Sequence, residues 1–212
     1  EIFGYFMNRL GAYRVDRRKK NPIYIETLMG MSSLSLQKKV NGLFFPGGTR
    51  SRSGALEEDL KQGLLNSLIE AQRTIYQRGD DLKVIVVPLV INYHVVLEAD
   101  HLITQHLNVL GKDSFVHVKD DFQSYSKVLR FLWRFFSQRS EIYLSVGHPM
   151  DVMGNLLDEN GESIDHQGQI VDLKDYFKTD DIIQPNEQRE KVYTRHLADA
   201  IVKSYKKYNI AL

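Results

Sequence analysis

The segment at residues 43–54 constrains the fold more than any other part of the chain. It reads Leu-Phe-Phe-Pro-Gly-Gly-Thr-Arg-Ser-Arg-Ser-Gly. The apolar run at 43–45, closed by proline and glycine, is typical of the end of a buried strand. Apolar residues then recur at three- and four-residue steps from Leu56 to Ile75, which predicts a helix with one apolar face. Glu57, Glu58 and Asp59 are expected in its first turn, where they would complement the helix dipole.

A second apolar run at residues 84–90 predicts another strand, of the near-continuous kind that a parallel sheet buries on both faces. Strand, crossover helix and strand form the repeating unit of an α/β fold, so we expect residues 43–46 and 84–91 to be neighbours in one mostly parallel central sheet. The rest of the pattern predicts helices at 1–10, 23–39, 124–138 and 187–208, and strands at 12–16, 40–45, 115–118 and 141–146.

One domain is expected for a chain of 212 residues. The domain prediction is therefore a single unit over 1–212, with a hairpin-like insertion at 154–172 indicated by turn residues. No internal repeat is apparent.

The residues of the loop at 47–54 indicate an anion site. Glycine permits close approach of a ligand to the backbone, and the two hydroxyl residues at 49 and 51 alternate with Arg50 and Arg52. Guanidinium groups suit phosphate or carboxylate. An ordinary strand-to-helix connection with two solvated arginines is the alternative. The P-loop and the dinucleotide fingerprint are excluded, because neither glycine spacing is present.

The same string closely resembles the Phe-Pro-Glu-Gly-Thr-Arg-Ser block of the glycerolipid acyltransferases, which acylate glycerol 3-phosphate and lysophosphatidic acid. The resemblance implies that the block helps to bind the phosphate of the acceptor. The positions that match are Gly48, Thr49, Arg50 and Ser51, followed by Arg52. Gly47 stands where the family usually has Glu, which puts in question how the glycerol hydroxyls are held.

Three further blocks agree with this family in order and spacing. Residues 11–17 resemble the Gly-x-x-Phe-x-x-Arg block and place Arg17 at its basic position. Residues 60–63 resemble the Phe-Lys-Arg/Lys-Gly segment and place Lys61 near the same anion, and residues 84–91 match the hydrophobic Val-Pro block. The resemblance therefore implies that Arg17, Arg50, Arg52 and Lys61 converge on one phosphate.

The catalytic pair of the family, written His-x4-Asp, is absent from the sequence. None of the seven histidines is followed by aspartate at that spacing. In the family the histidine is the general base on the acceptor hydroxyl and the aspartate orients it. We expect this pair upstream of residue 1, so no catalytic residue is assigned within the chain. A non-catalytic lipid-phosphate binding module and an ordinary sugar-phosphate binding domain are the alternatives.

The resemblance also implies the partners. The donor would be acyl-CoA or acyl-carrier protein as co-substrate, the acceptor glycerol 3-phosphate or 1-acylglycerol 3-phosphate, and no cofactor or metal is expected. A net charge of +1 argues against a general nucleic-acid binder. The absence of cysteine excludes a thiol nucleophile. A basic cluster at 14–20 and the apolar, arginine-flanked stretch at 128–136 predict association with the cytoplasmic face of a membrane, although 128–136 also suits a buried helix.

Overall fold

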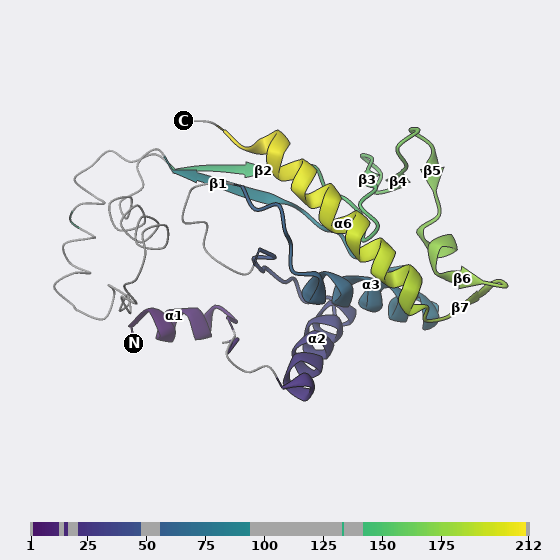
Figure 1. The fold of residues 1–212 in the computed structure, drawn as a ribbon, viewed down its shortest axis with the longest axis horizontal. Helices are drawn as coiled ribbons and strands as arrows, with labels where there is room; N and C mark the ends of the chain where they lie inside the picture. The colour runs from purple at the N-terminus through teal and green to yellow at the C-terminus, as the bar shows by residue number, and fades with distance from the viewer. Residues whose placement is uncertain are drawn as a thin grey trace, which may run out of the picture.

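The computed structural model describes residues 2–12, 15–16, 21–47, 56–93, 133 and 142–210. Its helices are α1 (Ile2–Arg9), α2 (Pro22–Gln37), α3 (Gln62–Gln77) and α6 (Glu187–Tyr208), with a short 3-10 helix η2 (Leu173–Phe177). The strands are β1 (Leu89–Tyr93), β2 (Ile142–Val146), β3 (Leu156–Leu157), β4 (Ser163–Ile164), β5 (Ile170–Val171), β6 (Lys178–Thr179) and β7 (Ile182–Ile183) (Figure 1).

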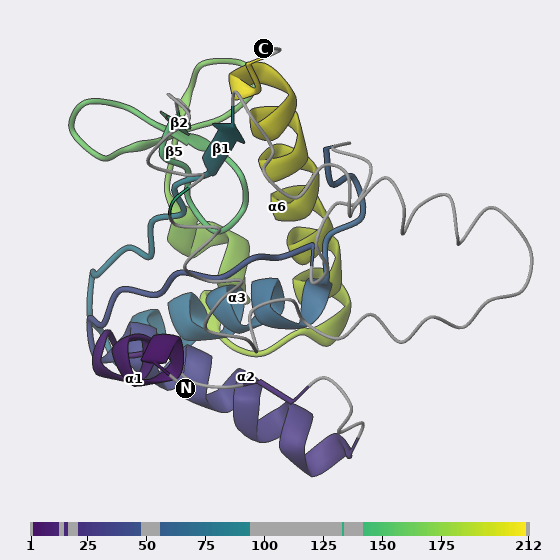
Figure 2. The same ribbon diagram turned by 90° about the vertical axis from the view of Figure 1, so that its left-hand side faces the viewer.

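Helix α3 is the centre of the hydrophobic core. Helix α2 packs on one side of it and α6 on the other, as two perpendicular views show (Figures 1 and 2). Leu65 and Ile69 of α3 and Leu197 of α6 are completely buried in one apolar cluster. Because α3 is covered on both sides, its apolar stripe supplies the stabilisation that the shorter elements lack.

Helix α2 begins with a local cap and then shows an unusual division of faces. The side chain of Asn21 accepts a hydrogen bond from the amide of Ile23, and Pro22 occupies the first turn. Small hydroxyl residues meet α3, where Ser67 donates to Ser32 at 2.9 Å. The large side chains of Met31 and Leu34 remain exposed. The small residues allow α2 and α3 to approach closely.

A buried glutamine joins α3 to the chain that follows it. Gln72 accepts from the amide of Val84 at 2.6 Å and donates to the carbonyl of Leu82 at 2.9 Å. The side chain thus makes the hydrogen bonds that a neighbouring strand would make. Val86 then pairs with Met150, and β1 pairs with β2 in antiparallel register from Leu89 opposite Val146 to Tyr93 opposite Ile142.

The predicted central parallel sheet is not found in the described part of the chain. The sheets there are small and antiparallel: β1-β2, β3-β4-β5 and β6-β7. The correct class for these residues is therefore mixed helices with small antiparallel sheets. The prediction of an α/β fold was right in its mixture of elements and wrong in their pairing.

The strand predicted at 40–45 is wrong. Residues 40–45 have no regular structure, and Leu43 and Phe45 are each 76% exposed, while Phe44 packs against the core. Residues 43–46 and 84–91 are consequently not neighbouring strands. The apolar run was read as a buried strand although only one of its three side chains is used for burial.

Residues 84–91 also differ from the prediction of a strand buried on both faces. Val84 and Val90 are buried, whereas Ile85, Val87 and Ile91 are exposed. This alternation is that of a ribbon with one covered face. The described residues 12, 15 and 16 lack the strand predicted at 12–16. The predictions for 115–118 and 124–138 lie outside the described residues, except Trp133, which is helical and exposed.

The helix predictions were better. Those at 1–10, 23–39 and 187–208 are confirmed by α1, α2 and α6. Helix α3 begins at Gln62 rather than Leu56, so Glu57, Glu58 and Asp59 precede the helix and are not in its first turn. In α6 the acidic residues Glu187 and Glu190 do lie in the first turn, and Lys206 and Lys207 in the last, in accord with the dipole.

A repeated turn that the sequence analysis missed builds the meander β3-β4-β5. The pattern Asp-x-x-Gly recurs every seven residues, beginning at Asp151, Asp158 and Asp165. In each turn the aspartate Oδ1 accepts from the backbone amides two and four residues on, and the glycine has positive φ. The meander lies within 154–172, and its status as an insertion remains a prediction.

No helix among the described residues is long and apolar enough to cross a bilayer.

We predict that the glycines of the repeated turns differ sharply in their tolerance of alanine. Gly154 and Gly168 have φ of +89° and +81°, so alanine pays the same backbone cost of about 1–2 kcal/mol at either site. At Gly154 a Cβ would also lie 2.7 Å from the Cβ of Ala200, whereas nothing lies within 4 Å at Gly168. Gly154→Ala should therefore lose roughly 1–3 kcal/mol more than Gly168→Ala in urea unfolding. Equal losses would show that the turn does not press on α6.

The same turns should lose stability in acid. The pKa of Asp158 lies below its ordinary value of 3.8 because the backbone amide of Glu162 donates to it, and that of Asp165 is lowered in the same way by Gln169. A carboxylate with a lowered folded pKa stabilises above its unfolded pKa, and this contribution disappears as the pH falls through the folded pKa. Asp158→Asn with Asp165→Asn keeps an acceptor oxygen but cannot titrate. Its melting temperature should fall less than that of the parent below about pH 4. Asp199→Asn, at an exposed position of α6, is the control and should follow the parent.

Candidate functional site

The structure describes only one of the seven predicted phosphate-binding residues, Lys61, together with the two ends of the loop that carries most of the others. The remaining six lie outside the described residues: Arg17, Gly48, Thr49, Arg50, Ser51 and Arg52. Their roles remain predictions. The site is therefore built from the chain that leads into the loop and the chain that leaves it.

The two ends of the loop are joined at its base. The amide of Lys61 donates to the carbonyl of Pro46 at 2.7 Å. Phe44 on the incoming side and Leu60 on the outgoing side both belong to the core. The backbone of Lys61 consequently lies beside the turn at Pro46 and Gly47, next to the first glycine of the predicted anion site.

The outgoing end leads directly into α3. Lys61 is the N-cap residue of this helix, no side chain caps it, and its first turn contains no acidic residue. The first amides of a helix carry partial positive charge and favour an anion. The exposed side chain of Lys61 adds a full charge at the same place. Hence the start of α3 offers free amides and one cation, Lys61, while the acidic residues Glu57, Glu58 and Asp59 lie directly before it.

Two carboxylates at 57 and 58 follow the basic loop and have different surroundings. Glu58 accepts from Lys206 of α6 at 2.6 Å, and this hydrogen bond lowers the pKa of Glu58. Glu57 turns to the loop instead: a Cβ added to Gly47 would lie 2.5 Å from its Cγ and from its Oε2. The side chain of Glu57 therefore covers the space that a side chain at position 47 would need.

Sequence reasoning missed this contact between Gly47 and Glu57. It noticed that Gly47 departs from the family's Glu, and it placed Glu57 in a helical turn. Nothing in the local pattern links two residues ten positions apart. A glycine where the resemblance expects an acid, with acids soon after it, was the available signal.

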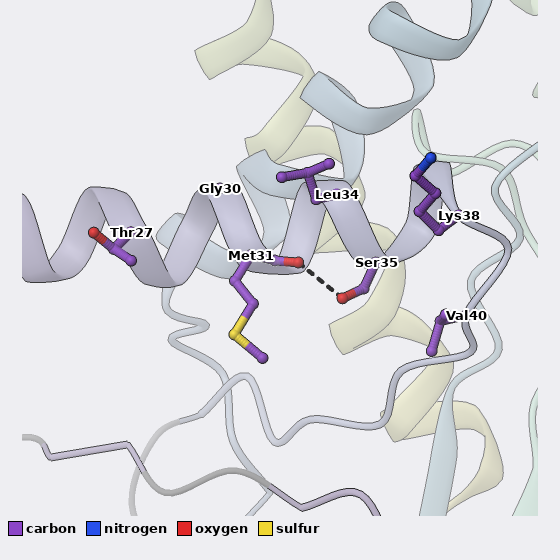
Figure 3. Close-up of a pocket in the computed structure, with 7 residues that line it drawn as sticks. All are labelled: Thr27, Gly30, Met31, Leu34, Ser35, Lys38 and Val40. Carbon is purple, nitrogen blue, oxygen red and sulfur yellow. Dashed lines mark hydrogen bonds between the residues drawn. The ribbon is translucent and has the colours of Figure 1, made fainter.

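An open groove of 560 Å³ runs along the outer face of α2. Its lining is mostly apolar and is formed by Thr27, Gly30, Met31, Leu34, Ser35, Lys38 and Val40 (Figure 3). The hydroxyls of Thr27 and Ser35 donate to carbonyls of their own helix, at 2.7 and 2.9 Å, and Lys38 is the only charged residue of the lining. The groove can therefore contact a hydrocarbon chain, but its lining has few polar groups that could bind or react with a ligand.

Other polar groups of the described core hold the structure together. The Nε of Arg73 donates to Glu190 at 2.8 Å, between two largely buried side chains of α3 and α6. Burial raises the pKa of Tyr76 well above its usual value, so this phenol stays neutral. No group of metal-ligating side chains occurs within the described ranges. None of these residues suggests a general base.

Comparison with known proteins agrees with the blocks noted in the sequence. A family model described as Acyltransferase matches residues 1–92. No curated protein and no solved structure matches the chain significantly. The matched range contains the loop at 47–60, Lys61, α3 and most of β1, so the candidate phosphate site lies inside it. Over residues 1–92 the chain is thus similar to acyltransferases, in agreement with the resemblance to the glycerolipid acyltransferases seen in its sequence blocks.

Proposed function

We propose that the chain is part of an enzyme of phospholipid synthesis that transfers a fatty acyl group from an acyl thioester to a hydroxyl of glycerol 3-phosphate or 1-acylglycerol 3-phosphate. The donor is acyl-CoA or acyl-carrier protein. The observation that carries the proposal is the hydrogen bond between Lys61 and Pro46, which joins the two ends of the basic loop and places Lys61 beside Gly47 at the start of α3. These residues lie inside the range that matches the family model.

The role proposed for this loop is positioning. Arg50 would bind the acceptor phosphate with its fork of N–H donors, assisted by Arg17, Arg52 and Lys61 and by the amides and hydroxyls at 48, 49 and 51. A fixed phosphate fixes the distance from the acceptor hydroxyl to the thioester carbon, which converts a bimolecular encounter into an oriented one. The groove on α2 supports the proposal because its lining suits an acyl chain.

Proton transfer must come from outside this loop. The acceptor hydroxyl gives its proton to a general base as its oxygen attacks the thioester carbonyl, and the thiol leaves. The His-x4-Asp pair that would act as this general base is absent from residues 1–212.

We propose attachment to the cytoplasmic face of a membrane, where the acylated product belongs. A non-catalytic lipid-phosphate binding module is the second candidate, and it is favoured only if no His-x4-Asp pair precedes residue 1 in the parent gene.

The first functional prediction separates binding from catalysis. Residues 1–212 should bind glycerol 3-phosphate but show no transfer above about 10⁻² to 10⁻⁴ of the rate of a family enzyme with its base, because general-base catalysis is typically worth that factor. Calorimetry measures the binding, and release of free thiol from acyl-CoA measures the transfer. Rapid turnover by residues 1–212 would mean that another base is present.

The second functional prediction concerns Arg50. Arg50→Ala should weaken binding of glycerol 3-phosphate by roughly 10- to 100-fold, the range expected for charge-assisted hydrogen bonds. Arg50→Lys should recover only part of the loss, because an ammonium keeps the charge but not the planar fork. Arg195→Ala, at an exposed position of α6 outside the matched range, should leave the affinity unchanged. An Arg50→Lys variant with the affinity of the parent would remove the bidentate contact from the proposal.

A further inference from the structure

The two Asn-Gly pairs of the chain, Asn41-Gly42 and Asn160-Gly161, both lie in the described part of the structure but have different surroundings. Asn41 and Gly42 are exposed and have no regular structure. No hydrogen bond of the described residues involves the backbone or the side chain of either one. The amide nitrogen of Gly42 and the side-chain amide of Asn41 are therefore open to solvent and to each other.

The chain around Asn41 is fixed on both sides of the pair and not at the pair itself. The amide of Val40 donates to the carbonyl of Ser35 at 3.0 Å, and Figure 3 shows Val40 on the chain beyond the end of α2. Phe44 packs against the core. Between these two anchors, nothing lies within 4 Å of a Cβ built on Gly42. Rotation of the backbone at this pair therefore meets no obstacle in the described structure.

The second pair is held in one of the repeated turns. The amide of Asn160 donates to Oδ1 of Asp158 at 2.8 Å, and the amide of Gly161 donates to the carbonyl of Asp158 at 3.1 Å. The side-chain amide of Asn160 donates to Oδ2 of the same aspartate at 3.4 Å. The carbonyl of Gly161 accepts from Nζ of Lys83 at 2.7 Å. Both groups of this pair that could react with each other are thus engaged elsewhere.

We propose that Asn41 is a site of spontaneous modification, at which asparagine is converted to aspartate and isoaspartate by the chain itself and water. The amide nitrogen of Gly42 gives its proton to hydroxide and attacks the side-chain carbonyl carbon of Asn41. The new C–N bond closes a succinimide ring, and the side-chain nitrogen takes a proton from water and leaves as ammonia. Water then opens the ring at either carbonyl, which gives a carboxylate on an ordinary or on a lengthened backbone.

The residue after the asparagine makes this attack feasible, because glycine has no Cβ to crowd the nitrogen and permits backbone conformations that other residues disfavour. The product carries one more negative charge, placed directly after Lys38 and Lys39, so the net charge of the chain falls from +1 to zero. Isoaspartate also lengthens the backbone between α2 and Phe44. The inference is independent of the proposed function, because it requires only Asn41, Gly42 and water.

The experiment incubates residues 1–212 in mildly alkaline buffer, once folded and once in guanidinium chloride, and follows both pairs in the same sample. Trypsin releases Asn41 in the peptide 40–50 and Asn160 in the peptide 140–174. Mass spectrometry measures the conversion of amide to acid in each peptide, and an isoaspartate methyltransferase assay detects the lengthened product. Asn160 is the matched control, since the same two residue types react there.

In the folded chain Asn41 should react about 10-fold faster than Asn160 or more, because reaction at Asn160 must first break hydrogen bonds that are each worth up to about that factor. In guanidinium chloride the turn is lost and the two rates should become similar. Gly42→Ala should slow the reaction at Asn41 about 10-fold or more, a rise in the barrier of ~1.4 kcal/mol, and should leave Asn160 unchanged. Its fold should be kept, since a Cβ at this position meets nothing.

Two results would overturn the inference. If Asn41 reacts no faster than Asn160 in the folded chain, although both react alike in guanidinium chloride, the fold protects Asn41 as well. If Gly42→Ala leaves the rate at Asn41 unchanged, the nitrogen of residue 42 is not the nucleophile. Circular dichroism compares the variant with the parent, and the comparison of the two pairs within the parent decides the inference even if the variant does not fold.

Discussion

The burial of α3 between α2 and α6 is the interaction on which the other features depend. Its apolar stripe supplies the centre of the core, and its polar positions fasten the chain around it: Ser67 bonds α2, Gln72 holds the segment that leads to β1, and Arg73 pairs with Glu190 of α6. A helix fixed on three sides is a rigid support. The basic loop ends at the N-cap residue of this helix, so the packing of α3 fixes the position of one end of the candidate site.

The two ends of the loop are held by contacts with the core and with each other. Phe44 and Leu60 enter the core, and the hydrogen bond from Lys61 to Pro46 joins the two chains between them. Closing a loop of this length costs little more entropy than closing a shorter one. The arrangement fixes the points at which the chain enters and leaves the loop. Binding residues are often carried on a loop whose ends are held by a rigid scaffold.

The sequence predicted helices much better than strand pairing, for a physical reason. Helix α6 has an apolar period, acids in its first turn and lysines in its last, all signals contained within the segment itself. A strand needs a partner that is distant in the chain. Val84 finds hydrogen-bond partners in the side chain of Gln72 rather than in a strand, and residues 43–45 bury one side chain only. The repeated Asp-x-x-Gly turn was readable from the sequence, but only by comparing segments seven residues apart.

In the candidate site, too, features that depend on neighbouring residues could be predicted, whereas contacts between distant residues could not. The loop, its arginines and the family block are contiguous in sequence, so their chemistry could be predicted without coordinates. The contact between Gly47 and Glu57 could not, because it joins two residues that are ten positions apart in the sequence. A departure from a motif at one position is therefore ambiguous in sequence: it removes a group, or it makes room for the same group from elsewhere. The side chain of Glu57 lies where a Cβ on residue 47 would be, so its carboxylate stands beside the position at which the family block has its acid.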